Sequence, residues 1–291
     1  MTSPTLLIAN PHSRRGEAIA QAAAAALARC GVATVTARWD PAGLGALIRA
    51  QAAEAAVSAV VVAGGDGTLN AAADGVAASQ LPLGILPAGT ANDLARTLGI
   101  PRDLDAAAAV IAAGRTRRID LGMANDVPFF NVASIGFGVD LTRALTRDAK
   151  RRWGALGYAV AGLRVLRRMR PFRAWITQGG ETLVSRTIHV AVGNGRHYGG
   201  GMTVAGDAAI DDRRLDVFSL EVSGVWGLLR LLPALRSGRH HAWHEITTLT
   251  GEAMEVRTRR RRSVNTDGEI RTRTPVRFTI RPGAVTVFVP G

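Results

Sequence analysis

Cysteine, lysine and aromatic residues are scarce in this chain of 291 residues, and each scarcity excludes a class of protein. The single cysteine, Cys30, excludes an internal disulfide and any zinc or iron–sulfur site built on several cysteines. Aromatic residues make up 5% of the chain, too few for the stacking platforms of single-strand nucleic-acid binders. No uninterrupted apolar run reaches the ~18 residues of a membrane span, and the amino end lacks the basic stretch of a signal peptide. We therefore expect a cytoplasmic protein that binds no nucleic acid.

The charge of the chain is strongly positive and comes almost entirely from arginine. Lys+Arg number 36 against 23 Asp+Glu, which gives a formal charge of +13, and Lys150 is the only lysine. Such a balance suggests a partner that carries phosphates, such as a nucleotide or an anionic lipid. A genome-wide preference for Ala, Arg and Gly codons explains the same composition, so both interpretations stay open.

The first part of the chain alternates short apolar runs with alanine-rich helical stretches. This alternation predicts a parallel sheet covered by helices on both faces, a Rossmann-like α/β domain over residues 1–122. The predicted strands are Thr5–Ala9, Ala33–Thr36, Ala59–Ala63 and Leu83–Leu86; the predicted helices are Gly16–Ala28, Pro41–Ala56, Leu69–Ala78, a short one beginning at Asn92 or Asp93, and Asp103–Ala113.

After about Asp120 the pattern changes to strands separated by Gly, Asn and Asp turns, which predicts a mostly antiparallel β domain over residues 123–291. Two arginine-studded helices, about Asp140–Arg170 and Val225–His241, are expected within it. The predicted strands are Phe129–Ala133, Ala174–Thr177, Thr187–Val192, Leu215–Leu220, Ala253–Arg257, Val276–Ile280 and Val285–Val289.

The most informative motif is Gly64-Gly65-Asp66-Gly67-Thr68, which lies between a predicted strand and a predicted helix. Glycines there let backbone N–H groups approach a phosphate, and the helix adds the positive end of its dipole. A glycine-rich turn also occurs for structural reasons alone. Asp66 favours the functional interpretation, because an acid inside a phosphate-binding turn is suited to ligate Mg²⁺.

Two further polar loops follow predicted strands, Gly89-Thr90-Ala91-Asn92-Asp93 and Asn10-Pro11-His12-Ser13-Arg14-Arg15-Gly16. Asn92 or Asp93 can cap the next helix, and Thr90 can donate to a phosphate oxygen. Because ligands of open α/β sheets bind at the carboxyl ends of the strands, the three loops together predict a nucleotide site.

Two motifs stand out in the predicted β domain. The segment Gly193–Gly201 leads to Asp207, Asp211, Asp212 and Asp216, an acid-rich loop that could hold a divalent cation or form a plain polar turn. Near the end of the chain, Asp267-Gly268-Glu269 forms a tight turn. Glu269 is the natural general base if this turn faces the nucleotide loops.

These motifs, in this order along nearly the whole chain, resemble those of diacylglycerol-kinase-type lipid kinases, and most closely the soluble bacterial YegS-like branch. The resemblance implies an α/β nucleotide-binding domain followed by a β-sandwich domain, with the active site in the cleft between them. It implies ATP and Mg²⁺ as cofactors and a lipid as substrate. A lipid substrate in turn favours peripheral association with an anionic membrane surface, whereas no pattern indicates an oligomeric state.

Carried over residue by residue, the resemblance makes Glu269 the proton acceptor, with Asp267 supporting it and Asp66 contributing to catalysis. Backbone carbonyls at Ala209, Asp212 and Arg214 would hold a structural Mg²⁺. The implied ATP contacts are Asn10, Ser13, Thr36, Gly64, Gly65, Asp66, Gly67, Thr68, Leu69, Asn70, Ala71, Gly89, Thr90 and Asn92.

Three positions depart from the pattern of the family: Arg14 and Arg213 stand where glycine is usual, and Gly206 where proline is common. Two other readings of the motifs remain open. An NAD-kinase-like protein shares the Gly-Gly-Asp-Gly-Thr turn, but it would normally carry Asn-Glu where this chain has Asn92-Asp93. The other is a nucleotide-sensing regulator recruited to membranes, which the intact Asp66, Thr90 and Glu269 disfavour.

Arginine-rich segments allow a structural or a membrane interpretation. Lys150–Arg170 is typical of an interfacial helix or of a helix packed on the β domain, and Arg257–Arg262 is a solvated edge or a contact for lipid headgroups. His240, His241, His244 and Glu245 lack the spacing of a zinc site and predict a solvated helix end.

Overall fold

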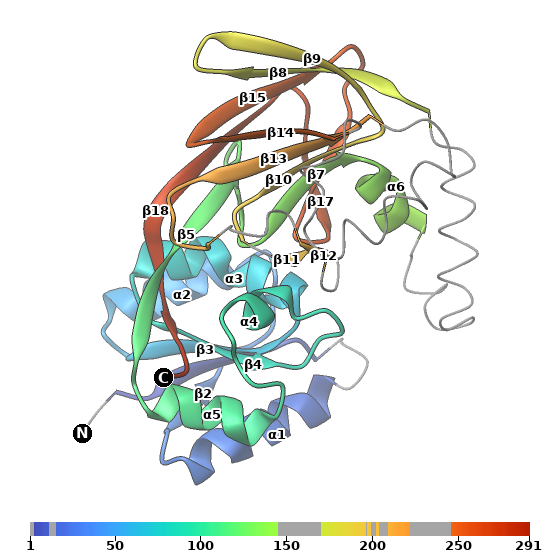
Figure 1. Cartoon of the computed structure of the whole chain (residues 1–291). Helices are drawn as coiled ribbons and strands as arrows, with labels where there is room; N and C mark the ends of the chain where they lie inside the picture. Colours follow the sequence, from blue (N-terminus) through green and yellow to red (C-terminus); the bar gives the residue numbers. More distant parts are fainter. Residues whose placement is uncertain are drawn as a thin grey trace. The chain divides into compact units, whose positions relative to one another are not determined.

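The computed structural model describes residues 3–11, 16–144, 170–195, 197–198, 202–203, 209–221 and 246–291. The chain forms two compact units (Figure 1). Unit 1 contains the chain up to Leu121 together with Arg281–Gly291, and unit 2 contains most of Gly122–Ile280.

Unit 1 is built on four parallel strands in the order β2 (Thr34–Thr36), β1 (Thr5–Ala9), β3 (Ala59–Gly64) and β4 (Leu83–Pro87). β1 and β4 are buried at every residue, and β3 is buried at all but its last. Strands covered on both faces need such continuous apolar runs. The predicted parallel α/β architecture is therefore confirmed.

Five helices belong to this sheet, and Figure 1 shows α1 and α5 on one face and α2 and α3 on the other. Their alanine-rich sequences let helix and sheet approach closely, and their buried residues are mostly Ala, Leu, Ile and Val. The helices are α1 (Gly16–Arg29), α2 (Leu44–Ala53), α3 (Asp66–Ser79), α4 (Asp93–Thr97) and α5 (Leu104–Ala112).

The helix predicted over Pro41–Ala56 is shorter at both ends. The Asp40 carboxylate accepts the backbone N–H of Ala42 (3.1 Å), a local turn that competes with helix formation. At the other end Ala55 adopts φ +50, a left-handed conformation that ends the helix. α3 in turn begins three residues earlier than predicted, because the Gly65 carbonyl accepts the N–H groups of Thr68 and Leu69.

Two strands, β5 (Thr116–Ala124) and β18 (Val276–Phe288), contribute residues to both units. The sequence predicts two strands where β18 is continuous through Gly283, which adopts φ +54. Side chains of β5 hold this point: the Gly283 N–H donates to the Asp120 carboxylate (2.6 Å), and the Gly283 carbonyl accepts from Arg118 (2.9 Å). The strand therefore continues through Pro282-Gly283, a residue pair that normally ends a strand, because residues distant in sequence bond to the backbone of Gly283.

Unit 2 consists mainly of antiparallel strands in two sheets, as predicted. Its core is a cluster of buried residues contributed by both sheets, including Ile176, Val190, Val217, Val256 and Phe278. One group pairs in the order β18, β15 (Ala253–Thr258), β8 (Phe172–Gln178) and β9 (Glu181–Thr187). The other runs β14 (Ile246–Gly251), β13 (Leu215–Leu220), β10 (His189–Gly193), β7 (Val132–Gly136), β16 (Ser263–Thr266) and β17 (Glu269–Arg273).

Smaller elements complete the described part of unit 2: β6 (Val127–Phe129), α6 (Phe137–Ala144), β11 (His197–Tyr198) and β12 (Met202–Thr203). α6 covers the start of the helix predicted over Asp140–Arg170; the rest of that helix up to residue 169, the helix predicted over Val225–His241 and the histidine group at 240–245 lie outside the described residues. No helix of the described residues is long and apolar enough to cross a membrane.

One histidine is buried in unit 2 without a charged partner in the described part of the chain. His189 is 5% exposed and contacts the rings of Phe137 and Phe218. Its Nδ1 accepts the backbone N–H of Gly138 at 3.4 Å. Burial lowers the pKa of His189 from its ordinary 6.5 to about 4, because the charged imidazolium would lose its hydration.

This burial predicts that the protein loses stability in mild acid. Below pH 6.5 the unfolded chain protonates His189 and the folded chain does not, so the free energy of unfolding falls until about pH 4. This difference between the pKa values of His189 in the unfolded and folded chain corresponds to a loss of about 3 kcal/mol in the free energy of unfolding. Urea unfolding between pH 6.5 and 4 should show that the free energy of unfolding depends less on pH in His189→Gln than in the wild type. A variant with the wild-type pH slope would contradict the prediction.

Candidate functional site

The three polar loops singled out in the sequence begin at one edge of the unit 1 sheet. Ala9 of β1 lies opposite Ala63 of β3, and Gly64 of β3 lies opposite Pro87 of β4. The strands are parallel, so all three end together and the next residues leave the sheet at its carboxyl edge. The structure thus brings together the loops that follow β1, β3 and β4.

Two of these loops touch through their glycines. A side chain on Gly89 would place its Cβ 2.5 Å from the Cα of Gly65, and one on Gly65 would place its Cβ 3.0 Å from the Cα of Gly89. Gly64 is constrained as well, since an added Cβ would lie 2.7 Å from the Thr68 hydroxyl. Backbone therefore packs on backbone between Gly65 and Gly89, and a side chain at Gly89 would clash with it.

Asn92 closes the second loop. Its side-chain oxygen accepts the N–H of Gly89 (2.9 Å), and its amide donates to the carbonyl of the same residue (3.0 Å). Asn92 itself adopts φ +52, a left-handed conformation that asparagine tolerates better than most residues. This buried side chain fixes the shape of the loop. Asn92, which the sequence predicts as an ATP contact, therefore also has a structural role.

Asp66 lies in the first turn of α3, half-buried, and its carboxylate accepts the N–H of Leu94 in α4 (3.3 Å). Burial raises the pKa of the Asp66 carboxyl above its ordinary value, and the negative charge of Asp93 raises it further, while backbone N–H groups oppose this. Two carboxylates at one sheet edge form a region of negative potential. The sequence singled out Asp93 only as a helix cap; its position in the chain did not reveal its proximity to Asp66.

The remaining predicted ATP contacts of α3 and the second loop differ in exposure. Gly67 and Thr90 are exposed and Ala71 is half-buried. Thr68, Leu69 and Asn70 are buried. The Leu69 side chain, 2% exposed, belongs to the core, so only the backbone of this residue could meet a ligand.

The remaining predicted ATP contacts lie in the first loop and on β2, which is separated from β3 in the sheet by β1. Asn10 is half-buried, and a side chain on Gly16 would clash with the backbone carbonyl of Asn10. Ser13 and Arg14 lie outside the described residues. Thr36 is exposed on β2, opposite Leu7, and the whole of β1 lies between β2 and β3.

In unit 2, Asp267 holds a tight turn in place. Its carboxylate accepts the backbone N–H groups of Phe130 (2.6 Å), Asn131 (3.0 Å) and Val132 (3.1 Å), and its own N–H donates to the Val132 carbonyl. These bonds tie the β16–β17 hairpin to the connection between β6 and β7. Asp267 therefore fits a supporting role, because its oxygens are already used by the backbone.

The same turn presents Glu269 to solvent. Asp267 (φ +48) and Gly268 (φ +94) form the two-residue connection of a hairpin with both residues at positive φ, the geometry that Asp-Gly favours. Asn265 accepts the Gly268 N–H (2.8 Å), and Glu269 follows as the first, exposed residue of β17. A rigid turn thus carries an exposed carboxylate.

The predicted metal loop is closed by Asp212. One oxygen of this carboxylate accepts the N–H of Ala209 (3.1 Å) and the other that of Arg214 (3.0 Å). Arg213 adopts φ +62, so an arginine occupies a left-handed position where glycine is favoured. Among the described residues, no three His, Cys, Asp or Glu side chains gather closely enough to hold a metal ion.

Asn194 joins the glycine-rich segment after β10 to the connection between β6 and β7, which also bonds the Asp267 carboxylate. Its amide donates to the Phe130 carbonyl (2.9 Å) and its N–H to the Asn131 carbonyl (2.8 Å). The sequence indicated the Gly193–Gly201 segment but not this connection. An asparagine beside a glycine is common in any turn, so no local signal distinguishes it.

Comparisons with known proteins agree with this arrangement. Residues 4–124 match the family "Diacylglycerol kinase catalytic domain", and residues 133–289 match "YegS C-terminal NAD kinase beta sandwich-like domain". A protein of Mycobacterium tuberculosis named "Diacylglycerol kinase" is 33% identical, over 97% of this chain and 94% of its own length. The chain belongs to the diacylglycerol kinase-like family of lipid kinases.

A second relative and a solved structure are also similar to this chain. "Probable lipid kinase YegS-like" of Pseudomonas putida is 34% identical, over 89% of this chain and 86% of its own. The crystal structure of a diacylglycerol kinase from Bacillus anthracis covers 99% of this chain and 97% of its own, with a TM-score of 0.78 and 24% identity. At that identity the likeness supports the fold: an α/β domain followed by a sandwich-like β domain.

The glycine contact predicts a strong effect of a small substitution. Gly89→Ala places a methyl group against the backbone of Gly65, which cannot rotate away, and should destabilise the protein by about 1–3 kcal/mol in urea unfolding. Gly45→Ala in α2 is the control, because its Cβ meets nothing closer than 3.4 Å and alanine favours a helix. Equal stability of the two variants would show that the loops do not touch as described.

A second prediction concerns the anchor of the hairpin. Asp267→Asn keeps the shape but turns one accepting oxygen into a donor that faces a backbone N–H, which should cost about 1–3 kcal/mol of unfolding free energy. Glu269→Gln, two residues away and exposed, should change stability by less than about 0.5 kcal/mol. If both variants unfold at the wild-type urea concentration, Asp267 does not hold the turn.

Proposed function

We propose that the protein is an ATP- and Mg²⁺-dependent kinase that phosphorylates the hydroxyl of diacylglycerol or a related lipid alcohol. The observation that carries the proposal is the contact between Gly65 and Gly89 at the carboxyl edge of the parallel sheet, with Asp66 beside it. Glycine backbones packed at this edge, next to a helix N-terminus, suit the polyphosphate of a nucleotide. Because the chain belongs to a family of lipid kinases, we assign phosphate transfer to a lipid as the reaction of this site.

The backbone at the start of α3 supplies donors for phosphate oxygens. Gly65 caps the helix, and the first N–H that a nearby carbonyl accepts is that of Thr68. The N–H group of Gly67 precedes it, and the first N–H groups of a helix have no backbone partner within the helix. The Asp66 N–H also precedes it, but it donates to the carboxylate of Asp66 itself. Thr90, exposed in the second loop, adds a hydroxyl donor, and Asn10 borders the same edge.

The acids of this edge fit a divalent cation. The raised pKa of the Asp66 carboxyl reflects burial and the nearby charge of Asp93, and a cation held there would offset both effects. Hard carboxylate oxygens are the donors that Mg²⁺ prefers. Bound with ATP, Mg²⁺ would neutralise the charge that develops on the phosphates. The carbonyls of Ala209, Asp212 and Arg214 would hold a second, structural ion in a loop already closed by Asp212.

In the proposed reaction, Glu269 takes the proton of the lipid hydroxyl. The lipid oxygen forms a bond to the γ-phosphorus as the bond to the β,γ-bridging oxygen breaks, and the products are the phosphorylated lipid and ADP. Such transfer depends on positioning and charge neutralisation, and a base that accepts the proton late completes it. The rigid Asp267–Gly268 turn supports the role of Glu269, because it limits the positions that the carboxylate can reach.

The central test measures phosphate transfer from radiolabelled ATP to a panel of lipids in mixed micelles. The panel contains diacylglycerol, sphingoid base, ceramide and phosphatidylglycerol, with NAD as an additional acceptor. The proposal expects a Mg²⁺-dependent radioactive lipid and no labelled NADP. Labelling of NAD alone would instead assign an NAD-kinase-like activity, and nucleotide binding without transfer to any acceptor would indicate a regulator.

Glu269→Gln should lower kcat by about 10²–10⁴-fold with little change in ATP affinity, because the amide keeps the size but cannot accept the proton. Measuring kcat and the nucleotide Kd on the same variant separates two roles. A weaker affinity for ATP–Mg²⁺ would make Glu269 a ligand of the cation rather than the base. An unchanged kcat would remove Glu269 from both roles.

Asp66→Asn should abolish transfer and leave the fold intact. The amide keeps a side-chain oxygen for the Leu94 N–H while removing a half-buried charge that Asp93 repels. Asp74→Asn on the same helix is a control, since this exposed carboxylate pairs with Arg49 at the protein surface. Activity of Asp66→Asn near that of the control would exclude Asp66 from the magnesium network.

A further inference from the structure

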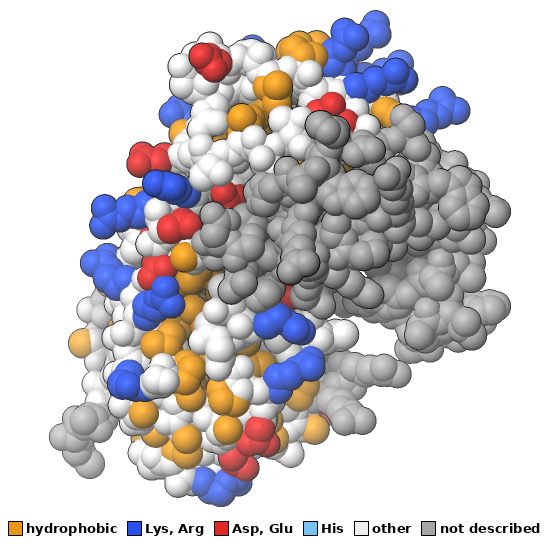
Figure 2. Space-filling model, viewed as in Figure 1, with side chains coloured by type: hydrophobic (Ala, Val, Ile, Leu, Met, Phe, Trp, Pro, Cys, Tyr) orange, Lys and Arg blue, Asp and Glu red, His pale blue; other side chains and the backbone are white. Residues whose placement is uncertain are grey.

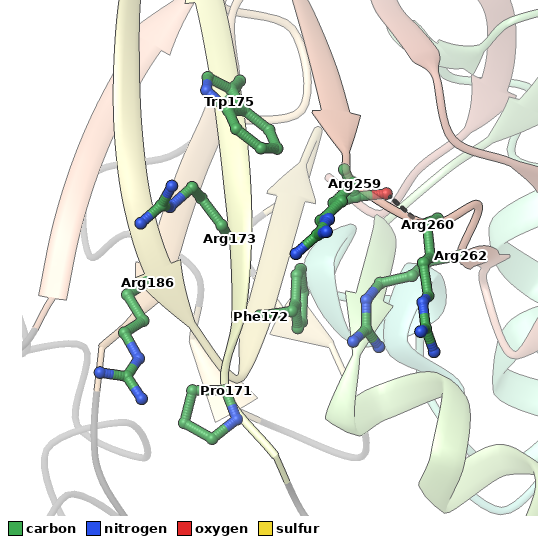
Figure 3. Close-up of a pocket in the computed structure, with 9 residues that line it drawn as sticks. Pro171, Phe172, Arg173, Trp175, Arg186, Arg259, Arg260 and Arg262 are labelled. Carbon is green, nitrogen blue, oxygen red and sulfur yellow. Dashed lines mark hydrogen bonds between the residues drawn. The ribbon is translucent and has the colours of Figure 1, made fainter.

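One surface of unit 2 gathers arginines around a hollow of about 540 Å³ (Figure 3). Arg173 and Trp175 come from β8 and Arg186 from β9, while Arg259, Arg260 and Arg262 follow β15. Figure 3 shows the Phe172 ring between Arg173 on one side and Arg260 and Arg262 on the other. We refer to these six residues and Phe172 as the arginine hollow.

Most charges of the arginine hollow have no acidic partner among the described residues; Arg262 is the exception, because the nearby charge of Asp140 acts on it. On the adjacent β15, Arg257 forms an ion pair with Glu255 (2.7 Å). Within the residues that the structure describes, the guanidinium groups of Arg173, Arg186, Arg259 and Arg260 form no ion pair. Arg262 stacks on Phe172, with its guanidinium carbon 3.9 Å from the ring centroid. The hollow therefore concentrates positive charge that the described residues neutralise only in part.

The pairing of β8 with β9 adds a specific repulsion. Arg173 lies directly opposite Arg186 in this antiparallel ladder. Like charges in such cross-strand positions destabilise a sheet. An anion between the two side chains would turn this repulsion into two favourable contacts, and the planar guanidinium matches a phosphate with two parallel hydrogen bonds.

Apolar groups lie beside these charges on the same strands. Trp175 is opposite Val184 in the β8–β9 ladder, and Val184 is 54% exposed. β9 is the last strand of its sheet. In Figure 2 blue arginine side chains gather where Figure 1 shows β8 and β9, with hydrophobic side chains among them. Tryptophan next to cations is the composition of a surface that meets both headgroups and acyl chains.

We propose that the arginine hollow binds the phosphate headgroups of anionic phospholipids in a bilayer. Arg173 and Arg186 would contact the headgroup phosphate, with Trp175 and Val184 at the boundary of the acyl chains. The proposal deepens the proposed function and rests on it in one respect, that a lipid kinase must meet its substrate at a membrane. Vesicle binding is measured without ATP, so it tests the hollow separately from the kinase activity.

The experiment measures sedimentation of the full chain with sucrose-loaded vesicles of phosphatidylcholine, either alone or with about 30 mol% phosphatidylglycerol. The test variant is Arg173→Gln/Arg186→Gln. The matched control, Arg277→Gln/Arg281→Gln, removes the same charge from two exposed arginines of β18. An arginine at an anionic surface contributes about fivefold to affinity, so the test variant should bind about 25-fold more weakly and the control within about twofold of wild type.

A stability measurement separates lost binding from lost folding. Removing the opposed charges should leave the unfolding temperature of Arg173→Gln/Arg186→Gln equal to or above that of wild type. Weaker vesicle binding by a variant of undiminished stability supports the proposal. If the β18 control loses binding equally, the net charge of the protein explains the effect, and the proposal is overturned.

Competition separates a bilayer from other sources of phosphate. Inorganic phosphate at millimolar concentration should leave vesicle binding unchanged, and duplex DNA should bind more weakly than anionic vesicles. Full displacement by inorganic phosphate would assign the hollow to a free anion, and tighter binding to DNA would assign it to nucleic acid. Either result would overturn the proposal. If lipid transfer fails while vesicle binding follows the prediction, the kinase proposal falls and the hollow stands.

Discussion

The backbone contact between Gly65 and Gly89 is the constraint on which the candidate site of unit 1 depends. Two turns at neighbouring strand ends can approach this closely only when neither carries a side chain. The approach places Asp66 against the start of α4, where Leu94 donates to it and Asp93 repels it. Asn92 then fixes the second turn through two hydrogen bonds to Gly89. Removing the contact would therefore disturb the acid as well as the glycines.

Acidic residues divide into those that hold the backbone and those that face outward. The carboxylates of Asp267 and Asp212 accept hydrogen bonds from backbone N–H groups and so stabilise the turns in which they lie. Glu269 is exposed on the turn that Asp267 fixes. The chain has 23 Asp+Glu against 36 Lys+Arg, so acids are outnumbered by cations even before any carboxylate bonds the backbone. The arginine hollow shares this excess of positive charge.

Much of the fold could be predicted from the sequence, because it depends on local pattern. Continuous apolar runs at β1, β3 and β4 bury both faces of a strand, and alanine-rich stretches between them form helices. The glycine turns after β3 and β4 were recognisable because few residues other than glycine fit there. What the pattern missed was non-local: β18 continues through Pro282-Gly283 because Arg118 and Asp120 hold that point. No periodicity within a strand reports a partner more than a hundred residues away.

The sequence by itself determined the order of the two architectures, the turns that carry glycine and the acids worth testing, since residue type and spacing fix these. Only the tertiary structure decided what each acid does. Asp267 and Glu269 stand two residues apart, yet one carboxylate accepts three backbone N–H groups and the other is exposed. Likewise the opposition of Arg173 and Arg186 arises from strand register. Hydrogen-bond partners and register come from chain segments that meet only on folding, so their effect cannot be read from either segment alone.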